Sequence, residues 1–168
     1  AVAGMLAAVD MAGVAELWAF GLKNALSCAF PAFVFGMLAV TKTAGALPLP
    51  RYDILFLSCV AFQALMVALR LETFDELKVI CVFHLLGLGL ELFKVHVGSW
   101  SYPDPATFSV GGVPLFSGFM YASVARYMIP AWRRLDLALV GWPRPRVVVP
   151  LGAAISANFF THHVLPDM

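Results

Sequence analysis

Charged side chains are scarce in this chain, and long apolar runs take their place. Only 12% of the 168 residues are Asp, Glu, Lys or Arg, whereas 61% are hydrophobic. An average soluble domain carries about 25% charged residues, so the composition excludes an ordinary soluble fold. The net charge of +1 gives no reason to expect a nucleic-acid partner. The composition therefore indicates an integral membrane protein.

Other absences narrow the chemistry. The sequence has three cysteines, Cys28, Cys59 and Cys81, all within apolar runs and without the spacing typical of zinc or disulfide frameworks. It has no glycine-rich phosphate loop, no G-x-S-x-G element and no repeated histidine boxes of the di-iron type. We therefore expect no metal site and identify no cofactor, and a hydrolase or nucleotide enzyme is unsupported.

Five apolar stretches approach the roughly 20 residues that a membrane-spanning helix needs. They are Leu22–Thr41, Ile54–Leu69, Val79–Val97, Val113–Trp132 and Val147–Leu165. Segments rich in proline and glycine separate several of them, as expected between helices. The sequence thus predicts an all-α fold, a polytopic transmembrane helix bundle with about five spanning helices.

The N-terminal stretch Ala1–Phe20 allows two interpretations. It is rich in alanine but interrupted by Asp10 and Glu16. We expect an N-terminal interfacial helix or tail at residues 1–20, followed by a transmembrane helical domain at residues 21–168. A sixth spanning helix is the alternative for residues 1–20.

The positive charges predict an orientation, because short cytoplasmic loops carry an excess of Lys and Arg. Eight basic residues fall on one predicted side and two, Lys42 and Arg51, on the other. The eight are Lys23, Arg70, Lys78, Arg126, Arg133, Arg134, Arg144 and Arg146. This split predicts a multi-pass protein of the bacterial inner membrane, with the N-terminal side cytoplasmic and the C-terminus outside.

One helical face of the third predicted span is polar and small. His84, Gly87, Glu91, Lys94 and Gly98 follow steps of 3, 4, 3 and 4, which places them on one stripe. The stripe is either a packing seam, in which glycines allow close approach and Glu91 pairs with Lys94, or a buried polar site for a headgroup, proton or pigment. Both interpretations stay open at this point.

Further polar residues are expected at the same outer-leaflet level. Asn158 and His162 share a face of the last span, and Ser117 and Tyr121 share a face of the fourth. The expected ligand-binding residues are His84, Glu91, Lys94, Trp100, Tyr102, Tyr121, Asn158 and His162.

Catalysis stays unassigned, with four of these residues as candidates. Glu91 would act as acid or base and Lys94 as its electrostatic partner, while Tyr121 and His162 would orient the ligand.

A resemblance to a known family rests on four stretches of the chain. They read LETFDELKVICVFHLLGLGLELFKVHVGSWSYP, GGVPLFSGFMYASVARY, AWRRLDL and NFFTHHVLPD. These stretches resemble the bacterial multi-pass membrane proteins grouped as domain of unknown function 817, over Phe20 to Asp167. The resemblance implies a membrane location and leaves the chemistry open. Because family members are longer, it also implies that this chain corresponds to their N-terminal part.

A second resemblance concerns the order of Glu91, the Gly98–Pro103 segment and Gly111-Gly112-Val113-Pro114. This order is similar to the layout of membrane carotenoid cyclases. Those enzymes place an acidic pair directly after the proline, where this chain has Leu115 and Phe116. The resemblance therefore implies an isoprenoid-like ligand, such as a carotenoid or other pigment, rather than the cyclase reaction.

Two functions of different classes follow from these observations. In the first, the outer-leaflet polar site binds or modifies a lipid, isoprenoid or pigment, with membrane lipids as partners. In the second, the chain is a non-catalytic transmembrane accessory subunit of a larger complex, for example a pigment–protein or respiratory assembly, and other transmembrane subunits are its partners. Whether the protein is an enzyme is left open by the sequence.

Overall fold

The computed structural model describes the backbone of residues 2–45 and 47–164, and their side chains except for residues 2–10, 12, 159 and 162–164. In this part of the chain there are six helices and one small hairpin. The elements are α1 (Val2–Ser27), α2 (Ala29–Thr43), α3 (Arg51–Ala68), α4 (Phe74–His96), β1 (Ser109–Val110), β2 (Val113–Pro114), α5 (Phe116–Arg134) and α6 (Pro145–Val164). The predicted helical fold is confirmed, with a two-stranded antiparallel hairpin added to it.

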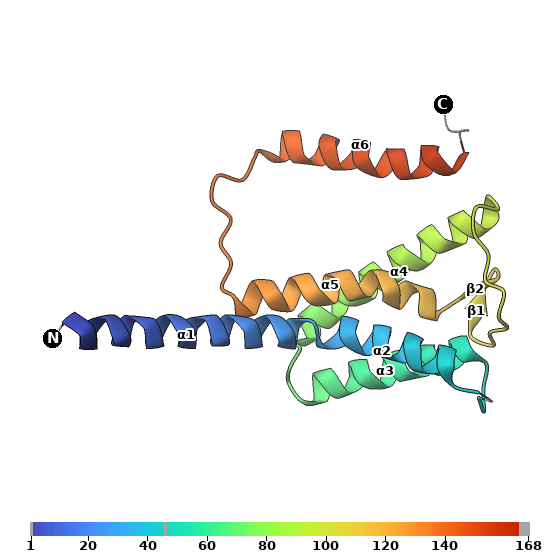
Figure 1. Ribbon diagram of the computed structural model, residues 1–168. Coiled ribbons are helices and arrows are strands. Elements are labelled where there is room, and N and C mark those ends of the chain that lie inside the picture. Colours follow the sequence, from blue (N-terminus) through green and yellow to red (C-terminus); the bar gives the residue numbers. More distant parts are fainter. Residues whose placement is uncertain (1, 46, 165–168) are drawn as a thin grey trace.

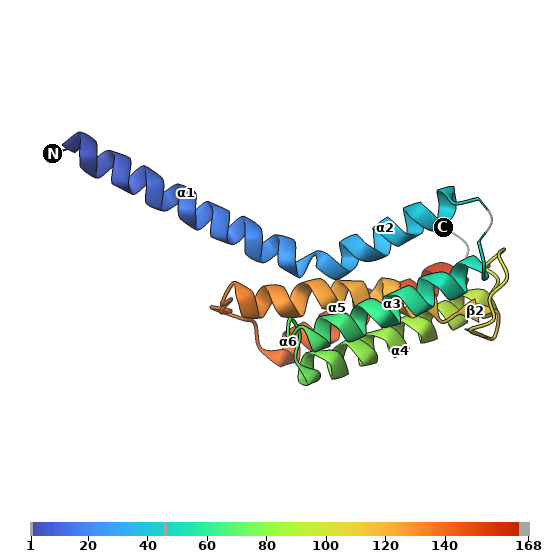
Figure 2. The same ribbon diagram turned by 90° about the horizontal axis from the view of Figure 1, so that it is seen from below.

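Four helices, α2 to α5, form the body of the molecule (Figures 1 and 2). The α5 helix is central, since it contacts α1, α2, α3 and α4. The α1 helix extends past the body at one end, and α6 follows a long connecting segment and runs beside the body (Figure 1). The hairpin and the loop before it lie at the end of the body where α2 ends and α3 begins.

Among the described residues, fewer helices are long and apolar enough to span a membrane than the five that the sequence predicts. Among the described residues, α3 and α4 are each long and apolar enough to cross a membrane. The bent pair Gly13–Ser27 and Ala29–Thr43 becomes a third candidate if it forms one span. Five spans are therefore not confirmed, and the structure supports two or three.

A bend interrupts the first predicted span, Leu22–Thr41. The helix axes on the two sides of Cys28 differ by 55°. Pro31 explains the break, because its nitrogen cannot donate to the carbonyl of Ser27 and its ring crowds that carbonyl. On the N-terminal side of the bend, α1 continues without interruption across Phe20, where the sequence predicted a boundary.

Two glycines set the approach of α4 to α5, which form the most extensive helix pair. A Cβ atom on Gly87 would lie 2.5 Å from the Cβ of Tyr121, and one on Gly118 would lie 2.6 Å from the carbonyl oxygen of His84. Since no real side chain tolerates such contacts, both positions require glycine. Gly87 of the predicted stripe thus serves packing and lets Tyr121 of α5 lie against α4, whereas Gly98 of the same stripe has no neighbour within 4 Å of an added Cβ.

Candidate functional site

The Glu91 carboxylate is the centre of a buried polar cluster one turn along α4 from Gly87. Its side chain is only 3% exposed. One oxygen, Oε1, accepts hydrogen bonds from Lys94 Nζ at 2.7 Å and from the Tyr121 hydroxyl at 2.6 Å. The other, Oε2, accepts from the Tyr102 hydroxyl at 2.7 Å. Lys94 reaches Glu91 because the two residues are three positions apart on one helix. The two tyrosines reach Glu91 only through the tertiary fold.

The loop between α4 and β1 delivers Tyr102, and Asp53 holds that loop in place. Asp53 lies in the first turn of α3 and is 2% exposed. Its carboxylate accepts hydrogen bonds from the backbone N–H groups of Thr107 and Phe108, each at 3.0 Å. Tyr102 also packs edge-on against Tyr52 of α3, with ring centroids 5.6 Å apart. The loop is therefore fixed to α3 on one side and to α4 on the other.

The Tyr102 phenol stays in its protonated, hydrogen-bond-donating form. Burial raises the pKa of Tyr102 above its ordinary value, and the negative charge of Glu91 raises it further. A neutral phenol at this position can donate to the carboxylate without adding a second negative charge.

A pocket of about 200 Å³ opens beside this cluster. It is lined by Leu38, Arg51, Tyr52, Glu91, Lys94, Trp100, Tyr102, Phe116 and Met120. An adjoining groove of about 390 Å³ shares three of these residues, and its walls are Glu91, Lys94, Met120, Tyr121 and Val124. The pocket is therefore continuous in its lining with a groove along α4 and α5.

Two cations stand at the pocket. Lys94 Nζ, besides its bond to Glu91, lies 5.4 Å from the centre of the Trp100 ring. The Arg51 guanidinium lies 3.5 Å from an Asp104 oxygen, and its other contacts, to the hydroxyl of Thr41 and a backbone carbonyl, are 3.3 and 3.4 Å long. Aromatic rings contact both cations, which is a favourable environment for positive charge.

The structure brings together five of the eight residues that the sequence predicted for a site. They are Glu91, Lys94, Trp100, Tyr102 and Tyr121. His84, on the same face of α4 two turns earlier, instead packs against the Phe119 ring with centroids 4.5 Å apart. Its contact with Gly118 makes it part of the α4–α5 seam.

The last predicted span does not contribute as expected. Asn158 is exposed on α6 and lines neither the pocket nor the groove, so its place in the site stays a prediction. The His162 side chain lies outside the described residues. Residues 135–144 form an irregular connection that sets α6 beside the body rather than within it (Figure 1). The Phe160 ring of α6 packs edge-on against the Phe93 ring of α4, with centroids 5.0 Å apart.

Sequence reasoning missed a second buried cluster, at the other end of the body. Arg126 of α5 forms an ion pair with Glu72, which precedes α4, and the two side chains are 1% and 0% exposed. Gln63 of α3 also donates to Glu72, and the Arg126 guanidinium lies 4.8 Å from the centre of the Phe30 ring. Arg126 was counted among the basic residues that predict orientation, but it is buried and neutralised rather than exposed in a loop. An arginine inside an apolar stretch was itself the signal for such a pair.

Other missed residues are Arg51, Tyr52 and Asp53, at the start of α3. The sequence used only Arg51 of the three, as a charge that predicts orientation, and the fold shows that they line the pocket or hold its loop. Among the side chains that the structure describes, no three His, Cys, Asp or Glu come together as metal ligands would.

Comparison with known proteins places the chain in a family. The model of the family described as "Protein of unknown function (DUF817)" matches residues 16–168. The chain is also 56% identical over 158 residues to the "Uncharacterized protein YoaT" of Bacillus subtilis (strain 168), a match that covers 94% of this chain. The chain spans 60% of the length of that relative. No solved structure matches this chain.

Proposed function

Since the chain belongs to the DUF817 family, whose function is unknown, we propose that it is a membrane protein that binds an amphipathic molecule, a lipid or an isoprenoid, beside Glu91. The observation that carries this proposal is the pocket at the Glu91 cluster, whose lining combines charged and hydroxyl groups with aromatic rings. Ionisable groups at membrane depth are costly and usually mark a site or a pair.

The size of the pocket favours a headgroup over a whole ligand. Pockets that enclose a drug-sized molecule measure roughly 300–1,000 Å³, and this one measures about 200 Å³. The adjoining groove along α4 and α5 is open and is lined by Met120, Tyr121 and Val124 next to the polar pair. A polar head in the pocket and an apolar tail in the groove account for both features.

Glu91 has an organising role in this proposal. Its carboxylate fixes the directions of Lys94, Tyr102 and Tyr121, which come from one loop and two helices. The positive-inside pattern supports a multi-pass arrangement in a bacterial inner membrane with the N-terminal side cytoplasmic. In that orientation the pocket lies in the outer leaflet.

A role as an accessory subunit is the alternative function, and the exposed apolar faces of α1 and α6 are compatible with it. Either lipid or a protein partner can cover such apolar faces. These faces therefore support the alternative less specifically than the pocket supports ligand binding.

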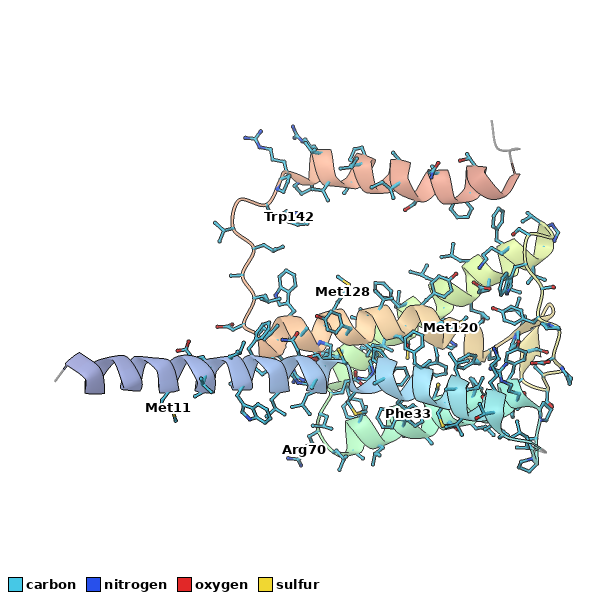
Figure 3. The ribbon with its side chains drawn as sticks, viewed as in Figure 1. Met11, Phe33, Arg70, Met120, Met128 and Trp142 are labelled. Atoms are coloured by element: carbon cyan, nitrogen blue, oxygen red, sulfur yellow. The ribbon has the colours of Figure 1, made fainter. Side chains whose placement is uncertain are left out.

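A pair of methionines on α5 allows a matched test. Met120 lines both the pocket and the groove, whereas Met128, two turns away on the same helix, lines neither (Figure 3). Met120→Trp should fill the groove, and Met128→Trp should add the same bulk elsewhere on α5. Native mass spectrometry of the full chain purified from membranes should show a bound amphiphile in the wild type and in M128W but not in M120W. Equal retention by both variants, or none by the wild type, would refute the proposal.

A further inference from the structure

We infer that the headgroup bound in this pocket is an anion of the phosphate-ester type, held between Lys94 and Arg51. The inference rests on the proposed function, because it names the chemistry of the same ligand. It follows from three properties of the pocket: the hydrogen-bonding capacity that remains at Glu91, the geometry of the two cations, and the balance of charge.

The Glu91 carboxylate has little capacity left for a ligand. Its two oxygens already accept three hydrogen bonds, of the roughly four that a carboxylate accepts. A cationic headgroup would have to displace Lys94 Nζ from its 2.7 Å contact. The single carboxylate in the pocket lining therefore does not favour a cation.

Donor groups, by contrast, remain available. Lys94 carries three N–H groups and uses one on Glu91. The Arg51 guanidinium makes contacts of 3.3, 3.4 and 3.5 Å, all longer than the 2.7–2.9 Å or so of a strong charge-assisted hydrogen bond. Among the described residues the Tyr52 hydroxyl, also in the lining, makes no hydrogen bond. Arg51 is thus loosely held and can turn its N–H groups toward an anion.

The charge balance of the lining agrees with an anionic headgroup. Two cations, Arg51 of α3 and Lys94 of α4, line the pocket together with one carboxylate, Glu91. A second carboxylate, Asp104, lies outside the lining, 3.5 Å from Arg51, and its side chain is 45% exposed. Because Asp104 is partly solvated and its contact with Arg51 is long, an anion in the pocket can compete for the Arg51 guanidinium. Arginine and lysine are also the usual ligands of phosphate, the former through its planar fork and the latter as a point charge. A phosphate ester offers several oxygens to donors that approach from two helices.

Headgroup selectivity of the wild-type protein tests this directly. The full chain in detergent is titrated with phosphatidic acid, diacylglycerol and phosphatidylcholine that carry identical acyl chains, and bound lipid is counted by native mass spectrometry. Phosphatidic acid should bind about tenfold or more tighter than diacylglycerol, as expected for the gain of at least one charge-assisted hydrogen bond. A competition experiment with inorganic phosphate tests whether the site binds the free ion. Inorganic phosphate should not displace the lipid at equal concentration.

Variants of matched charge locate the selectivity. Arg51→Met and Lys94→Met should each lower the affinity for phosphatidic acid about tenfold. Lys78→Met removes the same charge from the other end of α4, where Lys78 is exposed and pairs with Asp75, and should leave the affinity unchanged. Should Lys94→Met fail to fold, Arg51→Met and the wild-type headgroup series still decide the question.

The outcomes separate the two proposals. Equal binding of all three lipids, still abolished by M120W, would overturn the anionic headgroup and leave the amphiphile pocket intact. No binding of any lipid, or binding insensitive to M120W, would overturn both proposals. Full displacement by inorganic phosphate at equal concentration would show an ion site instead and would overturn the lipid ligand.

Discussion

Removal of Arg126 should strongly destabilise the protein, because it breaks a buried ion pair. The change Arg126→Met keeps an unbranched, flexible side chain but removes the guanidinium, and it leaves the Glu72 carboxylate, which is 0% exposed, with Gln63 as its described hydrogen-bond donor. Breaking a buried ion pair by removing one partner costs about 3–5 kcal/mol. Because neither side chain reaches solvent, the upper half of that range is expected.

The double variant Glu72→Met/Arg126→Met isolates the pair. Two nitrogens of the Arg126 guanidinium, Nε and Nη2, are buried without a described hydrogen-bond partner, so the native pair is incompletely compensated for its desolvation. Replacing a buried pair with apolar residues of similar volume is often neutral or stabilising, and the double variant should therefore be markedly more stable than Arg126→Met. The assay is loss of helicity on titration with a denaturing detergent in mixed micelles. If the single and double variants lose equal stability, or if Arg126→Met costs less than about 1 kcal/mol, the reasoning about this pair fails.

Three further predictions concern the seam, the loop and pH. Gly87→Ala should cost about 1–3 kcal/mol, because the new methyl group meets Tyr121, whereas Gly89→Ala, which meets nothing within 4 Å, should be neutral or slightly stabilising in the same assay. Asp53→Asn should speed hydrogen exchange at the loop amides that Asp53 accepts from, since a neutral amide accepts them more weakly; unchanged exchange would argue against this anchor. The raised pKa of Tyr102 gives stability that is full below the ordinary phenol pKa and is lost as pH rises through the higher folded-state value. The stability of the Tyr102→Phe variant should therefore fall less steeply with rising alkaline pH than that of the wild type. An unaltered dependence of stability on pH would contradict the raised pKa of Tyr102.

Local spacing predicted the features of the site that lie within one helix. Glu91 and Lys94 are three residues apart, and the i, i+3 rule places their side chains together. Gly87 shares that face, so a close helix approach at this level was also within reach of the sequence. Tyr121 was expected in the same site, but its direct hydrogen bond to Glu91 was not predictable from local spacing, because it lies 30 residues away and is placed by the fold.

The features that the sequence did not predict depend on long-range packing. Asp53 meets the loop amide of Phe108 across 55 residues, and no local pattern encodes that contact. Glu72 stood next to a turn and Arg126 inside an apolar stretch, and their pairing follows only from the packing of α5 against the α3–α4 connection. The prediction of five spans is not confirmed, and part of the difference lies in the first predicted span. Hydropathy measures apolar length, and it does not register the bend that Pro31 introduces there.

The most direct test of the central claim is to find where a bound lipid lies on the protein. Phosphatidic acid with a photoreactive diazirine near the start of one acyl chain is incubated with the full chain, activated by light, and its attachment sites are mapped by peptide mass spectrometry. Labels should concentrate on the residues of the groove, Met120, Tyr121 and Val124, and should disappear in M120W but not in M128W. Labels spread over α1 and α6 in proportion to their exposure, with no enrichment at the groove, would contradict the account.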